Sequence, residues 1–268
     1  MPSRTVRNDS AYAEKSLTPI SVIINADDLG INDGVNEAIF DLLARNQITS
    51  TTVLANGPRL KEAAASAHFF TGASFGVHLN LTQFEPLTRG LGPHLPTIRA
   101  LWSRNRIQQL AVKPVLLRAV YEEWCCQVDR LFSMGFSVSH IDSHHHIHTV
   151  PSLFPALKAV QRRFGIRKVR ISRNVYPVDF KISPTLAISK RAFNWALKRI
   201  YATHTTDAFT DFVTFCEGMN AAVKRSFQTI ELVVHPGSAG STKESQLLRS
   251  RWRANIATPV ILIPYQLL

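Results

Sequence analysis

Short apolar runs rich in β-branched residues alternate with longer amphipathic segments along most of the chain. Runs of this kind predict buried strands, and apolar residues at helical spacing predict the helices that cover them. Strands are expected at residues 21–26, 50–55, 75–81, 137–143, 169–172, 231–234 and 260–263. Helices are expected at residues 33–46, 59–67, 114–135, 151–164, 183–202 and 244–255. Residues 209–215 stay ambiguous, and residues 82–112 form a long connection.

The repeated strand–helix alternation predicts an α/β fold with a parallel sheet covered by helices. With about seven strands, a closed or nearly closed (β/α) barrel with its helices outside is favoured over an open doubly wound sheet. No G-x-G-x-x-G motif follows a strand, which weakens a dinucleotide-binding interpretation. We expect residues 1–19 to be a flexible polar leader and residues 20–268 to form a single barrel-like domain.

Composition excludes several classes of protein. Of the 268 residues, 45% are hydrophobic, which is enough for a large core and excludes wholesale disorder. Three cysteines give no disulfide framework, and neither a membrane-length apolar run nor a secretory signal is visible, so a cytoplasmic location is expected. The net charge of +12 admits nucleic acid, anionic lipid or an acidic substrate as partner, although the positive residues are scattered.

Two adjacent carboxylates, Asp27 and Asp28, follow the first predicted strand. They repel each other unless a cation or a proton lies between them. A loop that merely caps the next helix is the alternative, but Asp33 is already placed for that function. In α/β barrels the carboxyl ends of the strands carry the active site, so this pair is a candidate for chemistry.

Five of the ten histidines lie between residues 140 and 148, directly after another predicted strand. Side chains alternate along a strand, so His140, Asp142 and His144 are expected on one face. Neutral imidazole is a common metal ligand, and Asp142 is placed to orient one. A solvated histidine-rich loop is the alternative interpretation, which the flanking strand and helix make less attractive.

His78 and His235 complete the candidate set, because each lies at the end of a predicted strand. Either one alone would more often be structural. Together with Asp28 and His144 they form one carboxylate and several imidazoles on neighbouring strand ends, which is the ligand chemistry of a catalytic divalent site.

These stretches resemble the YdjC-like, or ChbG-type, carbohydrate deacetylases, in family order across residues 21–240. The matching stretches are Asn25-Ala26-Asp27-Asp28-Leu29-Gly30, residues 48–52, Gly76-Val77-His78-Leu79-Asn80-Leu81-Thr82, residues 140–148 and His235-Pro236-Gly237. Two positions depart from the family pattern: Leu29 stands where phenylalanine is usual, and Pro264-Tyr265-Gln266 stands where a Ser-Tyr-Arg run is common.

The resemblance implies a metal-dependent hydrolase that removes an N-acetyl group from an amino sugar, an oligosaccharide or a glycolipid. It implies one divalent ion, Mg²⁺ or Zn²⁺, held by Asp28, His78 and His144. It also implies that Asp27 is the general base and His235 the acid.

Further contacts and partners are expected around this site. Asn80, His146 and Arg170 are candidates for contacting the sugar. Some relatives are associated with hopanoid lipids, so a lipid-linked sugar and association with a membrane surface are both compatible, as is a homodimer.

Two alternative functions stay open at this point. A metal-dependent phosphoester hydrolase would also use a histidine-rich barrel end, with two ions instead of one. A basic protein that binds nucleic acid or a membrane surface through the helix around residues 190–199 ranks third, because it leaves Asp27, Asp28, His78 and His144 unexplained.

Overall fold

Seven strands and eight α-helices make up the part of the chain that the computed structural model describes, residues 18–268 without 112, 177–181, 219–226 and 257. The strands are β1 (Ile20–Leu29), β2 (Ser50–Val53), β3 (Ser74–Leu79), β4 (Val138–Ser143), β5 (Ala208–Asp211), β6 (Thr229–Val234) and β7 (Val260–Leu262). The helices are α1 (Asp33–Ala44), α2 (Leu60–Ala67), α3 (Leu95–Ser103), α4 (Pro114–Ser133), α5 (Phe154–Phe164), α6 (Pro184–Arg199), α7 (Phe212–Gly218) and α8 (Thr242–Arg249). Residues 1–17 of the expected leader lie outside the described residues.

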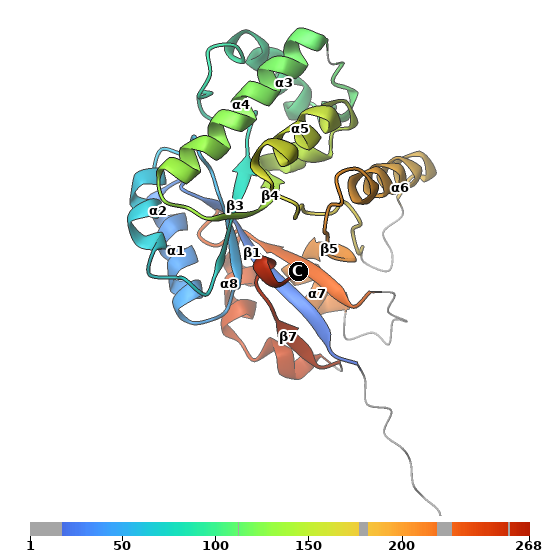
Figure 1. Cartoon of the computed structure of the whole chain (residues 1–268). Helices are drawn as coiled ribbons and strands as arrows, with labels where there is room; N and C mark the ends of the chain where they lie inside the picture. Colours follow the sequence, from blue (N-terminus) through green and yellow to red (C-terminus); the bar gives the residue numbers. More distant parts are fainter. Residues whose placement is uncertain (1–17, 112, 177–181, 219–226, 257) are drawn as a thin grey trace, which may run out of the picture.

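The strands form one parallel sheet in the order β4-β3-β2-β1-β6-β5, with the helices around it (Figure 1). The short strand β7 pairs with the beginning of β1, at Ile20–Val22, whereas β2 pairs with β1 from Asn25 onward. No helix among the described residues combines the length and the apolar composition that crossing a bilayer requires.

The edges of this sheet, β4 and β5, are bridged by an irregular segment at residues 168–175. Ile141 pairs with Val169 on one side, and Asn174 pairs with Phe209 on the other, both in parallel register. Isolated backbone bonds, such as Arg170 N–H to the Ile141 carbonyl at 3.0 Å, take the place of a full ladder. The expected strand at 169–172 is therefore a bridging segment, and the barrel-like α/β fold is confirmed.

Alternation along the strands separates an apolar outer face from a polar interior. On β1, Val22, Ile24 and Ala26 belong to the apolar core under the helices, whereas Asn25 and Asp27 point the other way. The same parity holds on the other strands: Val77, Ile141 and Leu232 lie in the outer core, and His78, Asp142 and Glu231 are buried inside the barrel. Polar side chains thus occupy much of the space that the strands enclose, beside a small apolar cluster of Ile171, Phe209 and Val233.

Helix boundaries follow local chemistry. Asn32, not the expected Asp33, caps α1, since its side-chain oxygen accepts the backbone N–H of Val35 at 2.8 Å. Helix α4 begins at Pro114 and α5 ends at Gly165, whose φ of 70° lies in the left-handed region that glycine adopts without strain.

The end of the chain crosses the barrel at the amino ends of its strands. The backbone N–H of Tyr265 donates to Ser50 Oγ at 3.0 Å, and that of Gln266 donates to Ser74 Oγ at 2.8 Å. The ring of Tyr265 is fully buried and stacks on His140 with centroids 3.7 Å apart. The side chain of Tyr265 therefore forms part of the barrel interior.

Gly76 leaves room for that stacked pair. A Cβ at position 76 would lie 2.5 Å from His140 Cε1, closer than real Cβ contacts. The imidazole cannot retreat easily, because Tyr265 lies against its face while Ser139 and Asn25 lie within hydrogen-bond distance of its two nitrogens. Only glycine fits at this point of β3.

We expect Gly76→Ala to lower the free energy of unfolding by about 1–3 kcal/mol, because it overpacks a rigid site. Urea denaturation monitored by circular dichroism measures the effect. Gly72→Ala is the matched control, since no atom lies within 4 Å of the Cβ that it adds. Equal stability of the two variants would contradict the steric interpretation.

Candidate active site

The three expected metal ligands converge at the carboxyl ends of the strands. Asp28 Oδ1 lies 2.8 Å from His144 Nδ1 and 3.2 Å from His78 Nε2. The three side chains come from the end of β1, from β3 and from the residue after β4, and all are buried. Asp28 adopts a φ of 72°, which is uncommon for a residue with a side chain and is typical of functional sites. The sequence prediction that these residues meet agrees with the geometry.

The remaining ring nitrogens of the two histidines face protein acceptors. His78 Nδ1 lies 2.7 Å from Asp142 Oδ1, and His144 Nε2 lies 2.7 Å from Gln83 Oε1. A nitrogen that donates to such an oxygen carries the proton, so the lone pair of each neutral ring points at Asp28. Asp28 Oδ1 itself has no hydrogen bond to any described residue. Three electron-rich atoms facing one another are the donor set of a cation site.

Electrostatics agree with a requirement for positive charge there. Burial tends to raise the pKa of Asp28, but the imidazoles of His144 and His78 outweigh it and hold the pKa below its usual range. Burial likewise lowers the pKa of His78, but Asp142 and Asp27 dominate and raise it to about 10. A proton on His78 is therefore strongly held unless a metal ion replaces it.

Among the described residues, Arg170 is the permanent cation that contacts the carboxylates of the interior. Its Nη1 and Nη2 donate to the two oxygens of Asp27 at 2.8 and 2.7 Å, and its Nε donates to Glu231 Oε1 at 2.8 Å. Nη2 also lies 2.8 Å from Asp142 Oδ2, and the guanidinium group is 1% exposed. One guanidinium thus orients three carboxylates, and through Asp142 it reaches the ligand His78.

Counting formal charges shows what this interior lacks. Once a metal ion has replaced the proton on His78, Asp27, Asp28 and Asp142 bring three negative charges against the one positive charge of Arg170, and Glu231 adds none while it holds its proton. Burial raises the pKa of Glu231 to about 7, in spite of Arg170. Uncompensated charge in a buried site is costly, so the balance of minus two fits a divalent cation. The residues present therefore fit the metal that the sequence predicts.

Asp27 and His235 lie side by side at the edge of this cluster. His235 Nε2 is 3.9 Å from Asp27 Oδ2, and its side chain is 45% exposed whereas that of Asp27 is 3% exposed. The carboxylate of Glu244 accepts the backbone N–H of His235 at 2.8 Å and fixes the turn after β6. Burial tends to raise the pKa of Asp27, but Arg170 outweighs it and lowers the pKa well below the usual range.

Two of the three residues expected to contact sugar are enclosed by protein. Arg170 donates to carboxylates as described, and Asn80 is 1% exposed with its amide donating to Asn56 Oδ1 and the Gln83 carbonyl. Asn80 Oδ1 in turn accepts the backbone N–H groups of Thr82 and Gln83. In this structure Asn80 holds the loop that carries Gln83, and Arg170 holds the carboxylates, while their contact with sugar stays a prediction.

His146 is the exposed member of the three. It lines a cavity of about 230 Å³ together with Arg170, Phe209 and residues of α6, and its ring meets Phe209 edge to face at 5.6 Å. His145 and His146 both have a φ of 54°, in the left-handed region. This turn directs His144 to Asp28 while leaving His146 beside the cavity, where a substrate group could reach it.

Sequence reasoning missed four residues that complete the site: Thr52, Gln83, Glu231 and Tyr265. Thr52 donates to Asp142 Oδ2 at 2.9 Å, and the Tyr265 hydroxyl donates to Glu231. Only Glu231 carried a usable signal, as a carboxylate inside an otherwise apolar strand. The others are ordinary polar residues whose roles arise from contacts distant in sequence.

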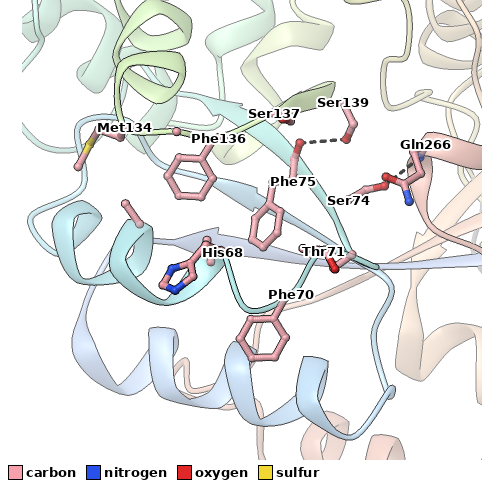
Figure 2. A pocket seen from close by; sticks show the side chains of 14 residues that line it. His68, Phe70, Thr71, Ser74, Phe75, Met134, Phe136, Ser137, Ser139 and Gln266 are labelled. Carbon is pink, nitrogen blue, oxygen red and sulfur yellow. Dashed lines mark hydrogen bonds between the residues drawn. The ribbon is translucent and has the colours of Figure 1, made fainter.

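A larger cavity, of about 560 Å³, opens at the opposite end of the barrel. It is lined by α2, the beginning of β3 and the loop before β4, with Phe70, Phe75 and Phe136 on its walls (Figure 2). Neither of the two described groups with metal-ligand geometry lies there. Chemistry is therefore concentrated at the carboxyl ends of the strands, as in barrels generally.

Comparison with known proteins identifies the family of this chain. Residues 21–257 match the sequence profile of the YdjC-like proteins. The chain belongs to the YdjC-like family. A carbohydrate deacetylase of Vibrio campbellii is 34% identical over 55% of this chain and 57% of its own length. A chitooligosaccharide deacetylase of an Enterobacter species is 29% identical over 82% and 83% of the two chains.

A solved structure of similar length shares the fold of this chain. A protein of Enterococcus faecalis, provisionally assigned as a cellobiose-phosphate cleavage protein, superimposes with a TM-score of 0.71. The match covers 93% of this chain and 98% of the other at 22% sequence identity, so it supports the barrel-like architecture alone.

The raised pKa of Glu231 predicts a pH-dependent stability. The folded protein binds the proton up to a pKa of about 7, whereas an ordinary glutamate loses it near 4.5. Stability from this group is therefore fully present below pH 4.5 and is lost as the pH rises through 7. Compared with Glu231→Gln, the unsubstituted protein should lose up to about 3 kcal/mol between pH 4.5 and pH 8.

Urea unfolding of both proteins across this pH range measures the difference. Glu37→Gln, a change at an exposed glutamate, should track the unsubstituted protein at every pH. A constant difference between the unsubstituted protein and Glu231→Gln would contradict a proton on Glu231.

Proposed function

We propose that this protein is a metal-dependent hydrolase that removes the N-acetyl group from an amino sugar, an amino-sugar oligosaccharide or a glycolipid. The observation that carries the proposal is the convergence of Asp28, His78 and His144 beside the carboxylate of Asp27. Relatives named carbohydrate deacetylase and chitooligosaccharide deacetylase support the reaction class. The three cysteines are free, which supports a reducing, cytoplasmic setting.

Asp28 Oδ1, His78 Nε2 and His144 Nδ1 would hold one divalent ion. When bound, such an ion polarises the amide carbonyl and acidifies a water molecule. Two imidazole nitrogens and one carboxylate suit Zn²⁺ better than Mg²⁺, which prefers oxygen ligands. Asp142 and Gln83 keep both rings in the tautomer that presents a lone pair to the ion.

Asp27 is the general base and His235 the general acid in this proposal. Asp27 takes a proton from the attacking water, and Arg170 keeps its carboxylate ionised and oriented for that step. Because Arg170 also makes Asp27 a weak base, the carboxylate releases the proton readily. His235, 3.9 Å from Asp27 and exposed on its other side, supplies a proton to the departing amine.

The alternative of two-metal phosphoester hydrolysis is less well supported. A second group of possible ligands, Asp27, His78 and Asp142, does lie together. However, Arg170 Nη2 lies 2.7 Å from Asp27 and 2.8 Å from Asp142. A guanidinium thus already lies against both carboxylates where a second ion would bind, and we expect one metal ion per chain.

Removing a metal ligand should abolish both metal binding and turnover. Asp28→Ala and His144→Ala are each expected to lower acetate release by about a thousandfold or more, since the ion both polarises the carbonyl and activates water. Metal content by elemental analysis and acetate release from a panel of N-acetylated sugars, with and without chelator, are the measurements. His68→Ala changes an exposed histidine directly after helix α2, and it should change neither metal content nor acetate release. Chelator-resistant activity would overturn the metal-dependent mechanism.

Asp27→Asn distinguishes the loss of the proposed general base from the loss of the proposed metal ligands. The amide keeps the shape of the side chain but cannot take a proton, so kcat should fall by about 10²–10⁴-fold while one metal ion per chain is retained. Asp41→Asn, a neutralised carboxylate in helix α1, serves as the control with unchanged kcat. Full activity of the Asp27 variant would show that another group is the base.

A further inference from the structure

Helix α6 presents an uncovered face with large apolar side chains at its centre. Ile188 and Trp195 are each 65% exposed, and their spacing of seven residues places them on the same side of the helix. Phe193 and Leu197 are buried on the opposite side, so the helix is anchored and the exposed pair is not part of the core. Exposed apolar side chains gathered on one helix face mark an interaction surface.

Basic side chains flank this apolar pair. At 100° per residue, Arg191 and Lys198 lie on one side of the line from Ile188 to Trp195, and Arg199 lies on the other. All three are exposed and none forms an ion pair with a described residue. The sequence of α6 contains no aspartate or glutamate. We call Ile188, Arg191, Trp195, Lys198 and Arg199 the α6 face.

The α6 face lies on the same helix that borders the candidate active site. Leu186 and Lys190 of α6 line the cavity of about 230 Å³ together with His146. Helices α1 and α2 lie on the other side of the barrel from α6 (Figure 1). Whatever docks on α6 is thus held next to the opening of the site.

We propose that the α6 face docks on an anionic membrane surface. Trp195 and Ile188 would enter the interfacial region of the lipid, and Arg191, Lys198 and Arg199 would contact anionic headgroups. A helix with an apolar centre, a tryptophan and a basic border is the composition of helices that lie in a bilayer interface. The net charge of +12 adds a long-range attraction to such a surface.

Two other occupants fit less well. A second copy of this chain, related by two-fold symmetry, would bring the basic border of the α6 face against itself. A nucleic acid would satisfy the basic residues but would leave the aliphatic side chain of Ile188 exposed to water. Of these three partners, the membrane alone matches both the apolar centre and the basic border of the α6 face.

Vesicle co-sedimentation of the full chain tests the proposal. The protein should bind vesicles of phosphatidylcholine and phosphatidylglycerol in equal parts, bind phosphatidylcholine alone far more weakly, and dissociate as salt is raised. Each basic residue near an anionic leaflet strengthens binding about fivefold, so the triple change Arg191→Gln, Lys198→Gln, Arg199→Gln should weaken it roughly a hundredfold. Ile188→Ser with Trp195→Ser should weaken it without removing the salt dependence.

The controls remove three basic residues and, separately, one exposed aromatic side chain elsewhere on the surface. Arg45→Gln, Lys61→Gln, Arg253→Gln and, separately, Phe69→Ser alter exposed residues away from α6 and should leave vesicle binding within about threefold. Acetate release from a soluble N-acetylated sugar should be unchanged in every variant, which separates this proposal from the catalytic one. Equal loss of binding in the control and α6 variants would overturn it. So would a dimer that α6 substitutions dissociate, or binding to nucleic acid but not to vesicles.

Discussion

One guanidinium in the barrel interior organises the chemistry of this protein. Arg170 donates to Asp27 through two nitrogens and to Glu231 through a third, and it lies 2.8 Å from Asp142. Without it, these buried groups would crowd at close range, and Asp27 and Asp142 would tend to take up protons instead of staying ionised. With it, Asp142 is a fixed acceptor that orients His78, and Asp27 is held in one position. Arg170 therefore acts in this structure as an internal support.

The position of Arg170 depends in turn on the end of the chain. Tyr265 donates to Glu231, stacks on His140 and is itself held by the hydroxyl of Ser50. These contacts link the amino ends of the strands, where the chain terminates, to the carboxyl ends, where the ligands lie. A polar column therefore runs through the barrel in place of the aliphatic layers that fill many β/α barrels. The hydrophobic core lies instead between the outer face of the barrel and the helices.

The parts of this structure that sequence could predict are those governed by local periodicity. Strand parity placed Asp28, His78 and His144 at neighbouring strand ends, and the geometry agrees because parallel strands share one carboxyl edge. Residues 169–172 were expected to form a strand, but they belong to a segment that joins β4 and β5 through isolated bridges, and these pairings involve residues distant in sequence. Glu231 and Tyr265 were missed for a related reason. Their partners lie 34 or more residues away, so only the folded chain reveals them.

The barrel interior contains two kinds of position for a positive charge, one fixed and one exchangeable. The difference between them matters for the proposed hydrolysis. Near Asp27, Asp142 and Glu231 the positive charge is covalently fixed, since a guanidinium cannot lose its proton in this environment. Near Asp28 it is exchangeable, because His78 holds either a proton on the nitrogen that faces Asp28 or a lone pair available to a metal ion. A fixed charge preserves geometry through a catalytic cycle, while an exchangeable one can bind water and a carbonyl oxygen. Arg170 contacts three of the four carboxylates, and Asp28 is the one that lies at the exchangeable position. One such position supports the proposed hydrolysis of an amide with a single metal ion over phosphoester cleavage with two.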